Sequence, residues 1–183
     1  MSDEATERDR MPVEQVLPGI ELPPIDDAKE ILFVFALIKY LYRDEPAEQV
    51  DRSWAYRTSS APNREELLGA LLVQVKLLEK ELATEWSSGQ TEDDEDDRRW
   101  APIQEVLPGV KLHPLGDVKE IDFVLALVKY LDGEEAEDEQ DRNWAFLASS
   151  DLNRAELLGA LRIQVRILED ELVMEWSSDG VDD

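Results

Sequence analysis

The chain of 183 residues contains no cysteine and only one histidine, His113. Without thiolates it can form no disulfide, no iron–sulfur cluster and no cysteine-ligated zinc site. The side chains that most often act as general bases, nucleophiles or transition-metal ligands are therefore nearly missing. We expect no catalytic residue, no cofactor and no bound metal, and we interpret the protein as a non-enzyme.

Basic residues are scarce as well: 19 Lys and Arg face 44 Asp and Glu, and the formal net charge is −25. Such a surface repels phosphate groups, so direct binding to nucleic acid or to an anionic membrane is not expected. Two interpretations of the acidity stay open. One is a halophilic-like adaptation to a salt-rich cytoplasm, which the low lysine content favours, and the other is attraction of a basic partner.

Long apolar runs are also missing. No segment reaches about 18 uninterrupted apolar residues, so no membrane span is expected. The first ten residues, MSDEATERDR, are polar and acidic and do not have the pattern of a secretory signal. Together with the lack of cysteine, these features predict a cytoplasmic protein.

What the sequence does contain is an internal repeat. Residues 12–88 align with residues 102–178 at a constant offset of 90 without a gap, and about 43 of the 77 aligned positions are identical. The acidic stretch between the copies includes DDEDD, which we interpret as solvated charge because no His or Cys accompanies it. The predicted organisation is a disordered acidic N-terminus (1–10), a first module (11–88), a flexible acidic linker (89–100), a second module (101–178) and a disordered acidic tail (179–183).

The clearest secondary-structure signal is NREELLGALLVQVKLLEKELATEWSS, residues 63–88, which recurs as residues 153–178. Apolar residues at spacings of three and four predict an amphipathic helix of about 24 residues. Asn63 with Glu66 three positions later predicts a capping box. Gly69 and Gly159 inside these helices cost about 1 kcal/mol relative to alanine, so we expect another backbone to approach them closely. The predicted apolar stripe comprises Leu68, Leu71, Val75, Leu78, Leu82 and Trp86, with the same residue types at 158, 161, 165, 168, 172 and 176.

The rest of each module is expected to be helical too. Ile31–Leu41 is apolar on nearly every face and follows DDAKE, which suits a helix start, although its β-branched and aromatic residues keep a buried strand open. Pro46 suits the first turn of a short helix over 47–57, and VLPGIEL predicts a type II turn in a short arm. The predicted fold is mostly α, with two to three helices per module after a short extended Pro-Gly arm. The copies either stay separate or pack as a pseudo-twofold helical bundle, and a homo-oligomer is a further option.

Residues that both copies share are the candidates for an interface or for fixing helix register. Gln74 and Gln164 flank the apolar stripe, where a half-buried amide needs a partner, so we expect an interhelical hydrogen bond. In one form of this contact the two amides face each other across a pseudo-twofold axis and fix the helix register. Tryptophans are expected to anchor contacts, including Trp54 and Trp144 on the long helices. The shared arginines are expected to form internal salt bridges, with binding of an anionic group as the alternative. The candidate set is Gln74, Gln164, Trp54, Trp144, Trp86, Trp176, Arg52, Arg142, Arg64 and Arg154.

Three functions fit these features. The favoured one is a non-catalytic protein-protein interaction, assembly or accessory protein with two similar modules, whose partner is another protein with a basic or apolar surface. The second is an acidic nucleic-acid mimic that inhibits a DNA- or RNA-binding protein. The third is a carboxylate enzyme that uses Mg²⁺, with Asp27, Glu30, Asp117 and Glu120 as candidates, although charge at helix N-termini explains those residues more simply.

Overall fold

The computed structural model describes residues 9–26, 28–42, 52–88, 99–132, 142–150 and 153–178. The predicted disordered N-terminus, most of the predicted linker and the acidic tail lie outside these ranges. The described chain is an α/β protein and not a mostly α one. The predictions of an all-α fold and of a helical bundle are therefore wrong.

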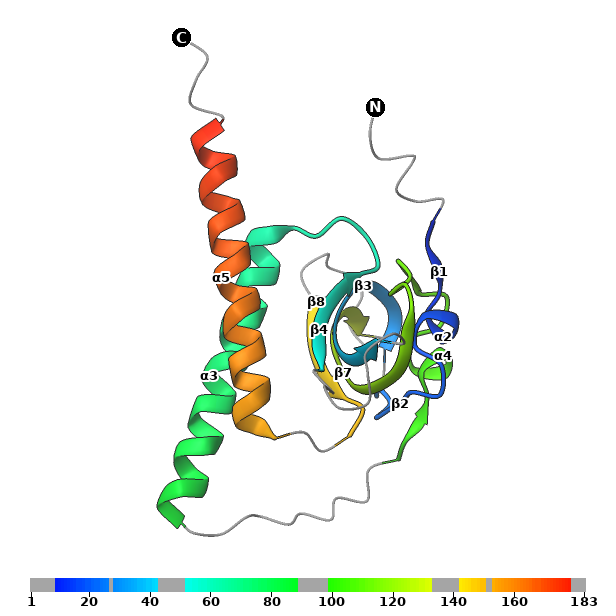
Figure 1. The fold of residues 1–183 in the computed structure, drawn as a ribbon, viewed down its shortest axis with the longest axis horizontal. Helices are drawn as coiled ribbons and strands as arrows, with labels where there is room; N and C mark the ends of the chain where they lie inside the picture. Colours follow the sequence, from blue (N-terminus) through cyan, green and yellow to red (C-terminus); the bar gives the residue numbers. More distant parts are fainter. Residues whose placement is uncertain are drawn as a thin grey trace. The chain divides into compact units, whose positions relative to one another are not determined.

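Each module contributes the same series of elements in the same order (Figure 1). In the first module these are β1 (Met11–Pro12), α2 (Val13–Val16), β2 (Glu21–Leu22), β3 (Ala28–Tyr42), β4 (Ser53–Thr58) and α3 (Arg64–Ser88). In the second they are β5 (Ala101–Pro102), α4 (Ile103–Val106), β6 (Lys111–Leu112), β7 (Val118–Asp132), β8 (Arg142–Ala148) and α5 (Arg154–Ser178).

Two compact units are built from these elements, and each unit takes segments from both modules. The first unit holds all eight strands and the two one-turn helices. The second unit holds α3 and α5. The duplicated sequence is thus interleaved in space, because a module does not form a compact body on its own.

The main sheet of the first unit is antiparallel with the strand order β4-β3-β7-β8, so the two longest strands lie at its centre. β3 and β7 pair in a register that places Ala36 opposite Ala126. These alanines are equivalent under the offset of 90, so a pseudo-twofold axis passes between them. The central contact of the sheet is therefore a contact between two copies of one sequence.

The short arms also pair across the modules. β1 pairs with β6 and β2 with β5. The Val13 N–H donates to the carbonyl of Val110 at 2.9 Å, and the Ile103 N–H donates to the carbonyl of Ile20 at 3.0 Å. The one-turn helices α2 and α4 contact each other and lie side by side in Figure 1. Each arm is thus held by the opposite module.

Each arm turns at a glycine. Gly19 and Gly109 both have a φ of 72°, a backbone conformation that glycine adopts without a steric penalty. The Pro-Gly turn predicted for each arm is therefore present. The arm is not simply extended, however, because a single helical turn precedes it.

One face of the sheet and the arms form the main hydrophobic core of this unit. Alternate residues of β3 and β7 point into it, as the two-residue period of a strand requires. Leu22 and Leu112, from the two-residue strands of the arms, are fully buried there. The core includes Val34, Ala36, Ile38, Val124, Ala126 and Val128 from the sheet, with Val13, Leu17, Leu22, Ile103, Leu107 and Leu112 from the arms.

The segment Ile31–Leu41, predicted as a buried helix, lies within strand β3. An apolar run without periodicity fits either structure, and here pairing with β7 along the length of β3 provides the partner that a strand needs. The predicted short helix over 47–57 is wrong where it is described, because Ser53–Thr58 is the edge strand β4. Residues 47–51 lie outside the described ranges.

The second unit is a pair of 25-residue helices, α3 and α5. Asn63 caps α3 by accepting from the Glu66 N–H at 3.0 Å, and Asn153 caps α5 by accepting from the N–H groups of Ala155 and Glu156. The helix predicted from residue 63 to residue 88 and its start signal are therefore confirmed, as is the second copy.

Candidate protein-binding surface

Reciprocal ion pairs join α3 to α5. Arg64 near the start of α3 contacts Glu175 at 2.8 Å near the end of α5. Arg154 near the start of α5 contacts Glu85 near the end of α3, which is the same pair with the modules exchanged. The helices are therefore antiparallel and related by a pseudo-twofold axis. Arg64 and Arg154 form the internal salt bridges that we expected of shared arginines.

A further ion pair between the helices breaks this symmetry. The Arg162 guanidinium donates to Glu79 at 2.7 Å, and Lys76 donates to the same carboxylate at 2.9 Å. The hydrogen bond from Arg162 and then that from Lys76 hold the pKa of Glu79 below its usual value. Leu72 is the counterpart of Arg162, so the reverse pair with Glu169 does not exist. The two helices thus differ in charge where they are otherwise alike.

The glutamines predicted to meet lie at the middle of the helix pair. Arg64 precedes Gln74 by ten residues and its partner Glu175 follows Gln164 by eleven, so the pseudo-twofold axis passes close to both amides. Gln164 is buried and Gln74 half-buried. Within the described residues neither amide has a hydrogen bond, and their role in fixing the register stays a prediction.

The buried side of each helix matches most of the predicted stripe. Leu71, Val75 and Leu78 are buried, as are their counterparts on α5. Trp86 and Trp176 differ, with 85% and 63% of their surface exposed, so they do not belong to the core. Their predicted role at an interface stays a prediction.

Further apolar side chains lie exposed on the same helices. Val73 and Ile163 occupy equivalent positions and are 57% and 61% exposed. The spacing that predicts the buried stripe does not include these positions. A signal was present, since both copies carry an apolar residue here although the position lies off that stripe. The exposed apolar residues are Leu72, Val73, Leu77 and Trp86 on α3 and Ile163, Ile167, Val173, Met174 and Trp176 on α5.

The expectation of a close backbone approach at the helix glycines is wrong. A Cβ atom added to Gly69 or Gly159 would meet no other atom within 4 Å. Both glycines are exposed on the helix surface. No contact among the described residues explains them.

Trp54 and Trp144, which we expected to anchor contacts on the long helices, instead lie on the edge strands of the sheet and contact side chains of its two central strands. Trp54 on β4 makes an edge-to-face contact with Phe123 at 6.2 Å, and Trp144 on β8 does so with Phe33 at the same distance. The ammonium groups of Lys39 and Lys129 lie about 6 Å from the respective indole rings. Each tryptophan therefore joins a strand of its own module to one of the other.

Arg52 pairs with Asp122 at the start of β7, so this ion pair also joins the two modules. The side chain of Arg142, its counterpart, lies outside the described part of the structure. In the first module Leu32 takes the place of Asp122. The binding of an external anion by Arg52, the alternative from the sequence, has no support from this internal pair.

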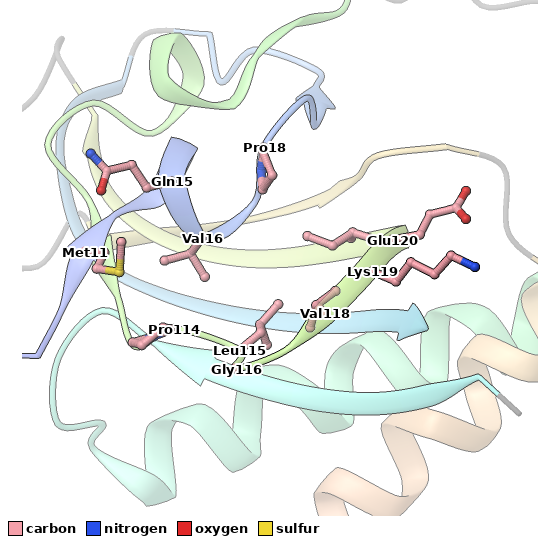
Figure 2. A pocket seen from close by; sticks show the side chains of 11 residues that line it. Met11, Gln15, Val16, Pro18, Pro114, Leu115, Gly116, Val118, Lys119 and Glu120 are labelled. Carbon is pink, nitrogen blue, oxygen red and sulfur yellow. The ribbon is translucent and has the colours of Figure 1, made fainter. Parts of the chain in front are cut away.

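A groove of about 520 Å³ opens between the first module's arm and the start of β7 (Figure 2). Apolar side chains from the arm face the loop before β7, while the charged ends of Lys119 and Glu120 lie at one end of the groove in the figure. Its wall residues are Met11, Gln15, Val16, Pro18, Pro114, Leu115, Gly116, Val118, Lys119, Glu120 and Ile121. The lining thus combines apolar side chains with the polar ends of Gln15, Lys119 and Glu120.

His113 takes part in a hydrogen-bond network and not in a reactive constellation. The Arg10 guanidinium donates to His113 Nε2 at 3.2 Å and to the carbonyl of Ser59 at 2.6 Å. Arg57 donates to the carbonyl of His113 at 3.1 Å. These contacts tie the start of the first arm to the second module.

Glu30 and Glu120, two of the acidic candidates for a magnesium site, lie at opposite ends of the β3–β7 pair. Glu30 and Glu120 are exposed residues of β3 and β7, so the predicted role as charge at a helix start is wrong for them. Asp27 lies outside the described ranges. Over the residues that the structure describes, no group of three or more Asp, Glu or His side chains is arranged to hold a metal ion.

Among the described side chains, Tyr40 is the one whose pKa lies far from its ordinary value. Burial, followed by its hydrogen bond of 2.8 Å to the Tyr42 hydroxyl, raises the pKa of Tyr40 to about 12. Since a raised pKa opposes ionisation, this hydroxyl is a structural donor and not an activated base.

Comparison with family models, with curated proteins and with solved structures finds no match for the chain. None of the helices in the described part combines the length and apolar character that crossing a bilayer requires.

Proposed function

We propose that this protein is a non-catalytic assembly or accessory protein that binds another protein through the exposed sides of α3 and α5. The observation that carries the proposal is the set of exposed apolar residues on these two helices. Exposed apolar surface that recurs at the same positions of a repeat is a common mark of an interaction site. A cytoplasmic location is part of the proposal, since the acidic composition suits a salt-rich cell interior.

The duplication gives the protein two related surfaces. Val73 corresponds to Ile163, Leu77 to Ile167 and Trp86 to Trp176. The antiparallel arrangement of the helices places the two tryptophans at opposite ends of the pair. A partner that is itself repeated or dimeric would meet both surfaces, which suits an assembly role.

The expected partner surface is apolar with a basic contribution. Much of the carboxylate charge beside the helices is already engaged, as in Arg64 with Glu175 and Arg162 with Glu79. Charge therefore contributes to encounter and orientation, while the exposed Val73 and Ile163 side chains contribute contact that salt does not screen.

The proposal is tested by site-specific photocrosslinking in the cell that produces the protein. A photoreactive residue at position 73 or 163 should yield a discrete adduct that survives extraction at high salt. The matched control places the same group at Lys111, an exposed residue of β6 in the other unit. Adducts equal to those of the control would contradict the proposal, and an adduct with a nucleic-acid-binding protein that forms only at low salt would favour the mimic.

A further inference from the structure

The exposed side of α5 carries a seam of residues at alternating spacings of four and three. This spacing places side chains in one line along a helix and is the pattern with which helices pair in coiled coils. Every position of the seam is exposed to solvent, including Ile163 at 61% and Val173 at 58%. The seam comprises Gly159, Ile163, Arg166, Asp170, Val173 and Ser177.

The seam is complementary to itself when it is reversed. An antiparallel alignment about position 168 places Arg166 of one helix opposite Asp170 of the other, and it does so twice. The same alignment places Ile163 opposite Val173 and the small Gly159 opposite Ser177. Two ion pairs at the centre are thus flanked on both sides by apolar pairs, and Ile167 and Met174 lie beside the seam. Opposite charges and apolar pairs at facing positions favour such a contact.

The counterpart seam on α3 provides an internal comparison. It has Lys76 and Lys80 where α5 has Arg166 and Asp170. The same antiparallel alignment of two α3 helices would therefore place lysine opposite lysine, which repels. The α3 seam also has Val73 and the smaller Ala83 where α5 has Ile163 and Val173, so both its charges and its apolar pairs fit self-association less well.

We propose that α5 binds α5 of a second copy of this chain in an antiparallel, twofold-symmetric contact. Arg166 already lies 3.1 Å from Asp170 and 3.7 Å from Glu169 of its own helix. In the dimer, Arg166 exchanges its exposed ion pair with Asp170 of its own helix for one with Asp170 of the second copy. Because one exposed ion pair replaces another, the charges set the alignment of the helices, while the apolar residues provide most of the affinity. In the dimer, the exposed side of α3 is left for the partner of the proposed function. A crosslink from position 163 to a second copy of this chain would report the dimer, and one from position 73 to another protein would report that partner, so the two proposals fail independently.

A single helix-helix contact is small compared with a standard interface, so the expected dissociation constant lies in the micromolar range. Sedimentation velocity of the purified full chain over a wide concentration range measures it. Ile163→Glu places a charge in the seam and should raise the dissociation constant about tenfold or more. Val73→Glu, the matched change on α3, should leave it unchanged.

Charge exchange tests the orientation. Arg166→Asp and Asp170→Arg should each weaken the homodimer. The Arg166→Asp chain has two acidic residues at the centre of the seam and the Asp170→Arg chain has two basic ones, so like charges face each other in either homodimer. A mixture of the two variant chains should form a heterodimer at least as tight as the wild-type homodimer, since both facing pairs again have opposite charges. Circular dichroism shows whether these exposed substitutions leave the fold intact.

Three outcomes would overturn the proposal. A wild-type chain that stays monomeric at all concentrations has no such contact. A dimer that Ile163→Glu and Val73→Glu weaken equally uses another surface. Failure of the charge-exchanged chains to pair with each other, while the wild type does dimerise, rules out the antiparallel alignment.

Discussion

The two-residue strands of the arms should be as important for stability as the centre of the sheet. Leu22 of β2 and Leu112 of β6 are equivalent and fully buried, and each lies in an arm that pairs with the opposite module. Removing most of a buried leucine side chain loses about 2 to 3 kcal/mol of transfer free energy, and the cavity adds to this. Leu22→Ala and Leu112→Ala should therefore each lower the free energy of unfolding of this unit by about 3 to 4 kcal/mol.

Urea unfolding followed by tryptophan fluorescence measures this cost. Because the chain has two compact units with tryptophans in each, the fluorescence of all the tryptophans together would combine the unfolding of the two units. Replacing the exposed Trp86 and Trp176 by phenylalanine removes the reporters of the helix pair and leaves those of the sheet unit. Hydrogen exchange of β3 and β7 provides an independent probe of the same unit.

The matched control is Glu21→Ala, which shortens the exposed neighbour of Leu22 on β2 in the same unit and should cost less than about 1 kcal/mol. Equivalent positions should give similar costs, so the values for Leu22 and Leu112 should agree within about 1 kcal/mol. Costs below about 1 kcal/mol at both positions would refute the inclusion of the arms in the core. A large cost at one position alone would refute the pseudo-twofold organisation of the core.

Gly69→Ala and Gly159→Ala should each raise the free energy of unfolding of the helix pair by about 0.5 to 1 kcal/mol, because the added methyl group meets no atom. Unfolding followed by circular dichroism measures this change, and a lower free energy of unfolding in either variant would contradict the prediction. Because the folded pKa of Tyr40 is about 12 against 10 unfolded, its contribution is complete below pH 10 and is lost as pH rises through 12. Tyr40→Phe should reduce that alkaline loss in pH-dependent urea unfolding, whereas equal curves for it and for the control Tyr130→Phe would oppose this assignment. A protease site inserted within residues 89–98 and then cut should leave two fragments that co-elute, since the strand and helix pairings cross the modules; separation of the fragments without denaturant would count against the interleaved fold.

The candidate surface was only partly predictable from the sequence. The helix bounds, the caps and the position of Gln74 follow from local patterns and from the repeat. The exposure of individual side chains does not follow from such patterns, because Trp86 is equally apolar whether it lies in a core or in solvent. The self-complementary pattern from Ile163 to Val173 is visible in the amino-acid sequence, but only the structure shows that this side of α5 is exposed.

By itself the sequence determined the duplication, the acidic surface, the Pro-Gly turns and the two capped helices, all of which rest on composition or on contacts within a few residues. The tertiary structure decided that Ile31–Leu41 is a strand, because an evenly apolar run satisfies a helix and a central strand equally well. It also decided that each module completes the other. Pairing Ala36 with Ala126 joins residues 90 positions apart, and no local preference encodes a contact at that distance.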